Sequence, residues 1–238
     1  MMLMNKTTVS GYDSDLNDLT SRLSDLGSLA EGMLSDAMTA IRAHDEGLAR
    51  SVIDRDKLAN RFQAKIDEDA IRILALRSPM ATDLRRTVGA IRVATDLERV
   101  GDLSEGIAKR ALAVGQISER DIVRQIIMMG RQVQVHLSNA LNGLLKDDID
   151  TARQTWMADH DIDDMYAALL DSLISKMSSD PRIISDCTAL LFVAKNLERI
   201  GDHVSNICEV VYFTLTGRQL IDDEAIIRAS QNYAIGSD

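Results

Sequence analysis

The hexapeptide Leu97-Glu-Arg-Val-Gly-Asp102 recurs almost unchanged as Leu197-Glu-Arg-Ile-Gly-Asp202. The two copies lie 100 positions apart and differ only in Val100 against Ile200. Side chains four residues apart in an α-helix lie on one face, a turn apart. Each copy therefore places two carboxylates on one helix face, Glu98 with Asp102 and Glu198 with Asp202. The repeat predicts a duplicated chain with an acidic helix face in each half.

The composition favours an all-α fold. Hydrophobic residues make up 45% of the 238 residues and charged residues 27%, whereas aromatic residues are only 3% and there are two prolines. A β-rich protein normally has more aromatic and turn-forming residues. The net charge of −10 argues against nucleic acid as a partner, because phosphates require a basic binding surface.

Apolar residues recur at intervals of three and four almost throughout the chain, which predicts six amphipathic helices. Gly115 and Gly217 are expected to end the third and the sixth helix. Ser118 with Asp121 resembles a capping box that opens the fourth, and the pairs Ser78-Pro79 and Asp180-Pro181 resemble an N-cap followed by proline at the first helical position. The predicted helices cover approximately residues 16–41, 48–76, 79–114, 118–146, 149–177 and 181–215.

The duplication extends beyond the hexapeptides. Leu34–Ala37 matches Leu137–Ala140 at an offset of 103, against 100 at the hexapeptides. A deletion of three residues before Pro181 reconciles the two offsets. We therefore expect two tandem three-helix bundles related by internal duplication, residues 14–115 and 118–217. A tail of residues 218–238 follows, in which Ile221–Ala229 could add a short helix.

The offset of 103 also reveals a second acidic pair, because Asp159 and Asp163 correspond to Asp56 and Asn60. Two adjacent helices in each half then carry carboxylates, and like charges at this spacing repel each other. Hard or borderline cations with oxygen ligands would offset that repulsion. The alternative is that these carboxylates simply face water or an arginine. The candidate metal ligands are Asp56, Glu98, Asp102, Asp159, Asp163, Glu198 and Asp202.

Two further features concern these sites. Gly101 and Gly201 lie in mid-helix, where glycine is unfavourable by roughly 1 kcal/mol against alanine, so they indicate a close approach of helices. In the first half, Asn60 interrupts the acidic pattern and Lys109 stands where the second half has Glu209. The first site is therefore expected to be the weaker one.

The sequence argues against the common enzyme classes. A ferritin-like di-metal oxidase needs Glu-x-x-His elements, and none of the four histidines has a glutamate three residues before it. The chain has no glycine-rich phosphate loop and no nucleophile elbow. Cys187 and Cys208 are interpreted as reduced thiols without a function. A purely structural or metal-storage bundle stays open, but a metal-binding regulatory adaptor explains the duplicated acidic pairs better.

Taken together, these elements resemble the PhoU family over about residues 14–217. The resemblance rests on the two hexapeptides, on Pro79-Met-Ala-Thr-Asp-Leu-Arg85 before the first, and on Asp202-His-Val-Ser-Asn-Ile-Cys-Glu209 at the second. It implies two three-helix bundles that often dimerise and that bind multinuclear clusters of iron or another metal at the acidic elements.

The resemblance also implies a negative regulator of phosphate uptake. Such a protein acts between the nucleotide-binding subunit of the phosphate ABC transporter and the phosphate-sensing histidine kinase. The chain shows neither a signal peptide nor a run of apolar residues long enough to span a membrane. We therefore expect a cytoplasmic protein that reaches the membrane only through its partners.

Overall fold

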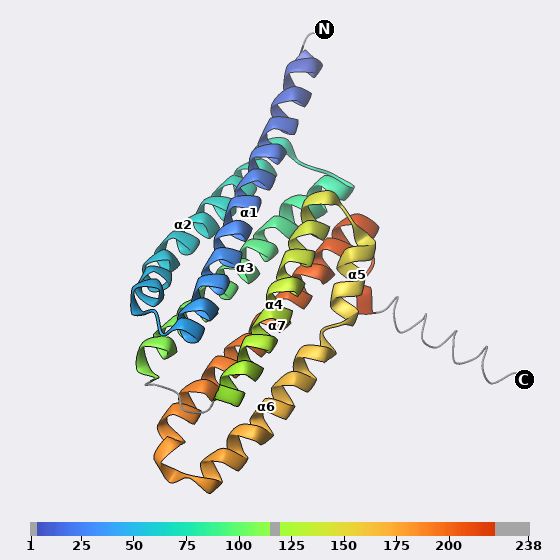
Figure 1. Ribbon diagram of the computed structural model, residues 1–238. Coiled ribbons are helices and arrows are strands. Elements are labelled where there is room, and N and C mark those ends of the chain that lie inside the picture. Colours follow the sequence, from blue (N-terminus) through green and yellow to red (C-terminus); the bar gives the residue numbers. More distant parts are fainter. Residues whose placement is uncertain (1–3, 115–119, 222–238) are drawn as a thin grey trace, which may run out of the picture.

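The computed structural model describes residues 4–114 and 120–221, and these ranges contain helices and no strand (Figure 1). The six predicted helices are present, although the fifth is broken in two and the sixth begins with a short 3-10 turn. The elements are α1 (Met4–Ala43), α2 (Glu46–Arg77), α3 (Ala81–Ala113), α4 (Arg120–Lys146), α5 (Ile149–Met157), α6 (His160–Ser179), η1 (Pro181–Ile183) and α7 (Ile184–Thr216).

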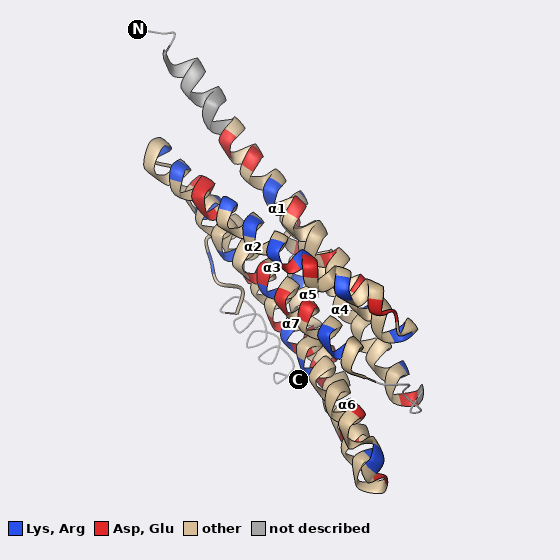
Figure 2. Ribbon diagram, turned by 90° about the vertical axis from the view of Figure 1, so that its left-hand side faces the viewer, with Lys and Arg blue, Asp and Glu red and all other residues tan. Residues whose placement is uncertain are grey.

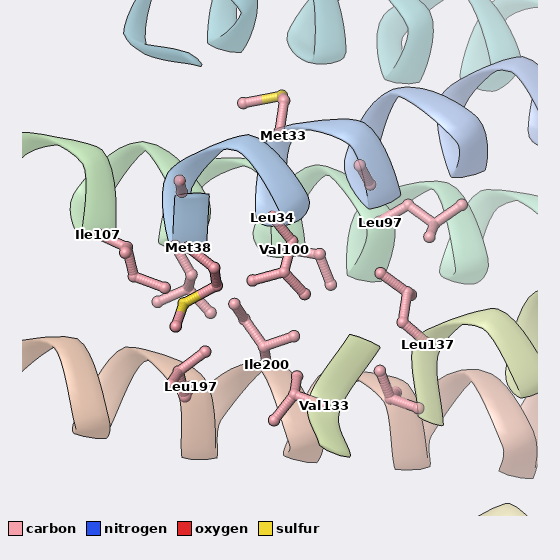
Figure 3. Close-up of a cluster of buried hydrophobic side chains, with 14 of the residues drawn as sticks. Met33, Leu34, Met38, Leu97, Val100, Ile107, Val133, Leu137, Leu197 and Ile200 are labelled. Carbon is pink, nitrogen blue, oxygen red and sulfur yellow. The ribbon is translucent and has the colours of Figure 1, made fainter. Parts of the chain in front are cut away.

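The helices form two bundles that share one core. Helices α1, α2 and α3 pack together, and α4 packs with α5, α6 and α7, while α3 also packs on α7 and α1 on α4. Figure 3 shows the centre of this core, where Val100 from α3 points toward Ile200 from α7. Both side chains are fully buried. The position at which the hexapeptides differ is thus a packing position between the bundles.

The backbone repeats the duplication in the loops between the first two helices of each half. Asp45 and Asp148, which are 103 residues apart, are N-caps with φ/ψ of −90°/96° and −91°/95°. The residues before them, His44 and Asp147, both take a left-handed conformation with φ of 53° and 54°. Each aspartate accepts a hydrogen bond from a backbone N–H three residues later. The offset inferred from the sequence is therefore also an equivalence in structure.

The seam between α1 and α4 is built around two glycines that we did not single out in the sequence. A Cβ atom at Gly27 would lie 2.7 Å from Leu141 Cδ2, and one at Gly130 would lie 2.5 Å from Met38 Cε. Gly27 corresponds to Gly130, and Met38 corresponds to Leu141, each at the offset of 103. The seam is thus approximately symmetric, with one close contact on each side.

The predictions at the helix ends had mixed outcomes. Gly217 ends α7 as predicted, with φ of 74° and an N–H that donates to the Phe213 carbonyl, and Asp180 caps η1 through the Arg182 N–H. The prediction for Ser78-Pro79 was wrong. Ser78 is the left-handed C-cap of α2, and α3 begins only at Ala81. A residue before proline is disfavoured in the α region, so Ser78 leaves the helix.

The predicted continuous fifth helix was also wrong, because the chain breaks between Met157 and His160. No proline or glycine lies in this stretch, so the sequence carried no signal for the break. The predicted stop at Gly115, the capping box at Ser118, and the tail beyond residue 221 lie outside the described residues.

Candidate functional site

The first acidic site lies where α2 crosses α3. A Cβ atom at Gly101 would meet Ala59 Cβ at 3.4 Å, so this glycine lies at a close approach of the two helices. Burial raises the pKa of Asp56, and the negative charges of Glu105 and Asp102 raise it further. Burial likewise raises the pKa of Glu98; Arg99 opposes this shift, while Asp102 and Asp56 add to it. The three predicted residues of this half therefore interact electrostatically.

The second site lies where the break between α5 and α6 meets α7. A Cβ atom at Gly201 would lie 3.2 Å from Asp159 Oδ1, so glycine here lets the Asp159 carboxylate approach the α7 backbone. Burial raises the pKa of Asp159, and the charges of Asp163 and Glu198 raise it further, against a hydrogen bond from Ser205. The pKa of Asp202 is raised by burial and then by Glu198, Asp159 and Asp163. The structure thus brings all four predicted residues of this half together.

Neutralising groups distinguish the two sites. In the first, Asn60 Nδ2 donates to Asp56 Oδ2 over 3.1 Å, and Lys109 Nζ lies 2.5 Å from Glu105 Oε2. Arg99 approaches Glu98 and Asp102 of its own helix at 3.6 and 3.8 Å. Two residues that we predicted as departures from the acidic pattern therefore contact carboxylates of this site.

The second site has a cation of its own, which we had not considered. Lys195 Nζ lies 2.6 Å from Glu198 Oε2, and the equivalent position in the first half is Thr95. Trp156 Nε1 donates to Glu209 Oε1 over 3.1 Å, which ties α5 to α7. The sequence contained a signal for this pair, because Lys195 and Glu198 are three residues apart and oppositely charged residues at that spacing are neighbours on a helix. Figure 2 shows that acidic and basic residues alternate along the ribbons of the first bundle.

The donor chemistry of both sites suits a hard or borderline cation. Asp56 Oδ1 is buried and accepts no hydrogen bond from the described residues, so it is an oxygen without a partner. However, in the described parts of the chain no three His, Cys, Asp or Glu side chains converge closely enough to hold a metal ion. The carboxylates would have to rotate to form a ligand set, and metal binding stays a prediction.

Polar contacts between α3 and α7 surround the sites. Asp96 Oδ1 on α3 accepts hydrogen bonds from His203 Nδ1 over 2.9 Å and from Asn206 Nδ2 over 3.3 Å. The residue equivalent to Asp96 is Asn196, whose Nδ2 donates to the Leu103 carbonyl at 3.3 Å. His203 therefore links the two bundles next to the second acidic site.

None of the described helices combines the length and the apolar character that a membrane crossing requires.

Comparisons with known proteins agree with the resemblance found in the sequence. A sequence model described as the PhoU domain matches residues 23–111 and again residues 126–211. A relative from Caulobacter vibrioides, named phosphate-specific transport system accessory protein PhoU homolog, is 40% identical over 91% of this chain and 95% of its own length. The Escherichia coli phosphate-specific transport system accessory protein PhoU is 32% identical over 90% and 89%.

Two solved structures have the same fold. The crystal structure of PhoU from Pseudomonas aeruginosa superposes with a TM-score of 0.81 and 35% identity, covering 87% of this chain and all of its own. The phosphate transport system regulatory protein PhoU from Streptococcus pneumoniae gives a TM-score of 0.81 and 30% identity, covering 87% and 98%.

Proposed function

This chain belongs to the PhoU family, and from that premise we propose that it is an accessory protein that negatively regulates phosphate uptake. In this proposal it acts in the cytoplasm as a homodimer. It contacts the nucleotide-binding subunit of a phosphate ABC transporter and a phosphate-sensing histidine kinase. It reaches the membrane only through these partners, and it catalyses no reaction itself.

The observation that supports an active role for the acidic faces is their arrangement. Asp56, Glu98 and Asp102 in the first half, and Asp159, Asp163, Glu198 and Asp202 in the second, gather at equivalent helix crossings. A bundle that served only as a scaffold would gain nothing from carboxylates that repel one another in two places. Bound cations, iron or another divalent or transition metal, would relieve the repulsion and hold adjacent helices together.

The adaptor role is tested by pull-down of the transporter subunit and of the kinase with the full chain. The comparison uses wild type, Glu198→Ala/Asp202→Ala and the matched variant Glu98→Ala/Asp102→Ala. We expect wild type to capture both partners and the second-half variant to capture less. If wild type captures neither partner, the adaptor role is wrong.

The metal is tested separately by elemental analysis of the purified chain. We expect a transition metal whose amount falls more in the second-half variant than in the first-half variant, because Asn60 and Lys109 already weaken the first site. The Asn60→Asp variant should contain more metal than wild type. A metal-free chain that still binds both partners would favour the alternative, a structural bundle whose carboxylates are neutralised by Lys195, Arg99 and Lys109.

A further inference from the structure

A small cavity lies in the seam between α1 and α4, away from both acidic sites. Its volume is about 80 Å³, and five polar side chains line it. Ser35, Thr39 and Arg42 lie on α1 at the spacing of one helix face, and Arg131 and Gln134 lie on α4. The remaining lining residues are Met38 and Ile127.

The hydrogen-bond donors of these five side chains are available to a ligand. Within the described residues, none of the five has an ion pair or a side-chain hydrogen bond. This contrasts with Thr20, Thr95 and several other helical hydroxyls, which donate to the carbonyl four residues earlier. Arg42 and Arg131 are both exposed and line one cavity, and neither has a counter-charge among the described residues, in a chain whose net charge is −10.

The duplication provides an internal comparison, because the seam is approximately symmetric. At the offset of 103, Arg42 corresponds to Leu145, Arg131 to Ser28 and Gln134 to Glu31, while Ser35 corresponds to Ser138. At the equivalent positions the chain therefore has a leucine, a serine and a carboxylate in place of three nitrogen donors. Packing of α1 on α4 does not require the arginines.

Helix electrostatics do not explain the arginines either. Arg42 lies in the last turn of α1, where a cation is favourable beside the exposed carbonyls. Arg131 lies in the middle of α4, where that effect is absent. Glu31 and Arg131 both line the adjoining groove of about 470 Å³, but they form no ion pair within the described residues.

We propose that this cavity is a binding site for a tetrahedral oxyanion of the phosphate class. Arg42 and Arg131 would supply charge-assisted hydrogen bonds, and guanidinium matches two phosphate oxygens at once. Ser35, Thr39 and Gln134 supply neutral donors to the remaining oxygens. The adjoining groove contains Val135 and Leu137, so it has room for an organic group attached to the phosphate. This site consists only of residues of the seam and does not depend on the proposed regulatory role.

The test is titration calorimetry of the full chain with inorganic phosphate and, separately, with phenyl phosphate, at ionic strength held constant with sodium chloride. Wild type is compared with Arg42→Leu/Arg131→Ser, which carries the residues that the fold already accepts at the other end of the seam. The matched control is Arg61→Leu/Arg92→Ser, which removes two exposed arginines outside the α1–α4 seam, on α2 and α3. Circular dichroism melting checks that both variants fold.

We expect saturable binding of one anion per chain, at least tenfold weaker in the seam variant and within about twofold of wild type in the control. Tighter binding of phenyl phosphate would identify an esterified phosphate as the ligand, and tighter binding of inorganic phosphate the free ion. Absence of saturable binding of both probes, or equal weakening in the two variants, overturns the proposal.

Discussion

Gly27 and Gly32 lie five residues apart on α1 but have opposite surroundings. A Cβ atom at Gly27 would lie 2.7 Å from the buried Leu141, whereas one at Gly32 would meet only Arg55 Nη1 at 3.7 Å. Gly27→Ala is expected to destabilise the fold by about 1–3 kcal/mol, because it overpacks the seam. Gly32→Ala should stabilise it by up to about 1 kcal/mol through helix propensity alone. Chemical denaturation measures both, and effects of the same sign would contradict this account of the seam.

Asp202 and Asp102 occupy equivalent positions but differ in their neighbours. The pKa of Asp202 is raised by burial and by three carboxylates, so the folded state favours its protonated form and ionisation at pH 7 destabilises the fold. Asp202→Asn should therefore raise the melting temperature at pH 7 in the presence of a chelator. The gain should shrink as the pH falls toward the ordinary aspartate pKa of about 3.9, where the unfolded chain is protonated too.

Asp102→Asn is the control for this experiment. Asp102 lies 3.8 Å from Arg99 Nη1, so its neutralisation removes this attraction together with the repulsion of Asp56 and Glu98, and it should give a smaller gain than Asp202→Asn. An equal rise in melting temperature for the two variants would show that the second site is not the more strained one.

His136 gives the fold a pH dependence near neutrality. It is buried in α4, its ring contacts Gln132, and burial lowers its pKa, while the charge of Asp161 opposes the shift. Above the ordinary histidine pKa of about 6.5 both folded and unfolded chains hold it neutral. As the pH falls below that value the unfolded chain takes up the proton first, so stability should decline.

The equivalent residue in the first half is Met33, which makes His136→Met a matched replacement. Melting temperatures between pH 7.5 and about 5 should fall less in this variant than in wild type. An unchanged slope would assign the pH dependence to other groups.

At the scale of the elements, the spacing of apolar residues predicted the six helices, but two departures could not be read from it. The φ angle of proline suits both the first turn of a helix and a linker. The sequence around Pro79 therefore did not predict that Ser78 would take a left-handed conformation. The break before His160 depends on how Asp159 and Ile162 pack against Gly201, which is a tertiary contact. The four carboxylates of the second site were predicted because the offset between the two halves identifies equivalent positions. The directions of these carboxylates could not be predicted, because side-chain rotamers depend on neighbours such as Ser205 and Lys195.

Helices α2 and α7 both end at a residue in the left-handed conformation, one a serine and the other a glycine. Ser78 ends α2 at φ of 47° and Gly217 ends α7 at φ of 74°. Residues with a Cβ atom are disfavoured there by about 1 kcal/mol, so Ser78→Gly should stabilise the fold and Gly217→Ala should destabilise it by about that amount. Denaturation midpoints of the two variants should move in opposite directions. Movement in the same direction would contradict the assigned conformations.

At the scale of the molecule, the symmetric arrangement of the halves explains why the bundles share a core. Each half supplies one helix to each of the two seams, α3 with α7 and α1 with α4. Figure 3 shows apolar side chains from all four helices filling the space between the seams. Neither bundle can therefore be removed without exposing the buried face of the other.

This shared core predicts that the two halves unfold together. Leu97 on α3 is fully buried, and Trp156, the only tryptophan, lies in the other half. Leu97→Ala removes core contacts and should cost about 2–5 kcal/mol. Because the core is continuous, the unfolding midpoint seen by Trp156 fluorescence should fall by the same amount as the midpoint seen by circular dichroism. Leu76→Ala, at a position that is 72% exposed, should leave both midpoints in place. If fluorescence kept its wild-type midpoint while circular dichroism showed two steps, the halves would be independent domains.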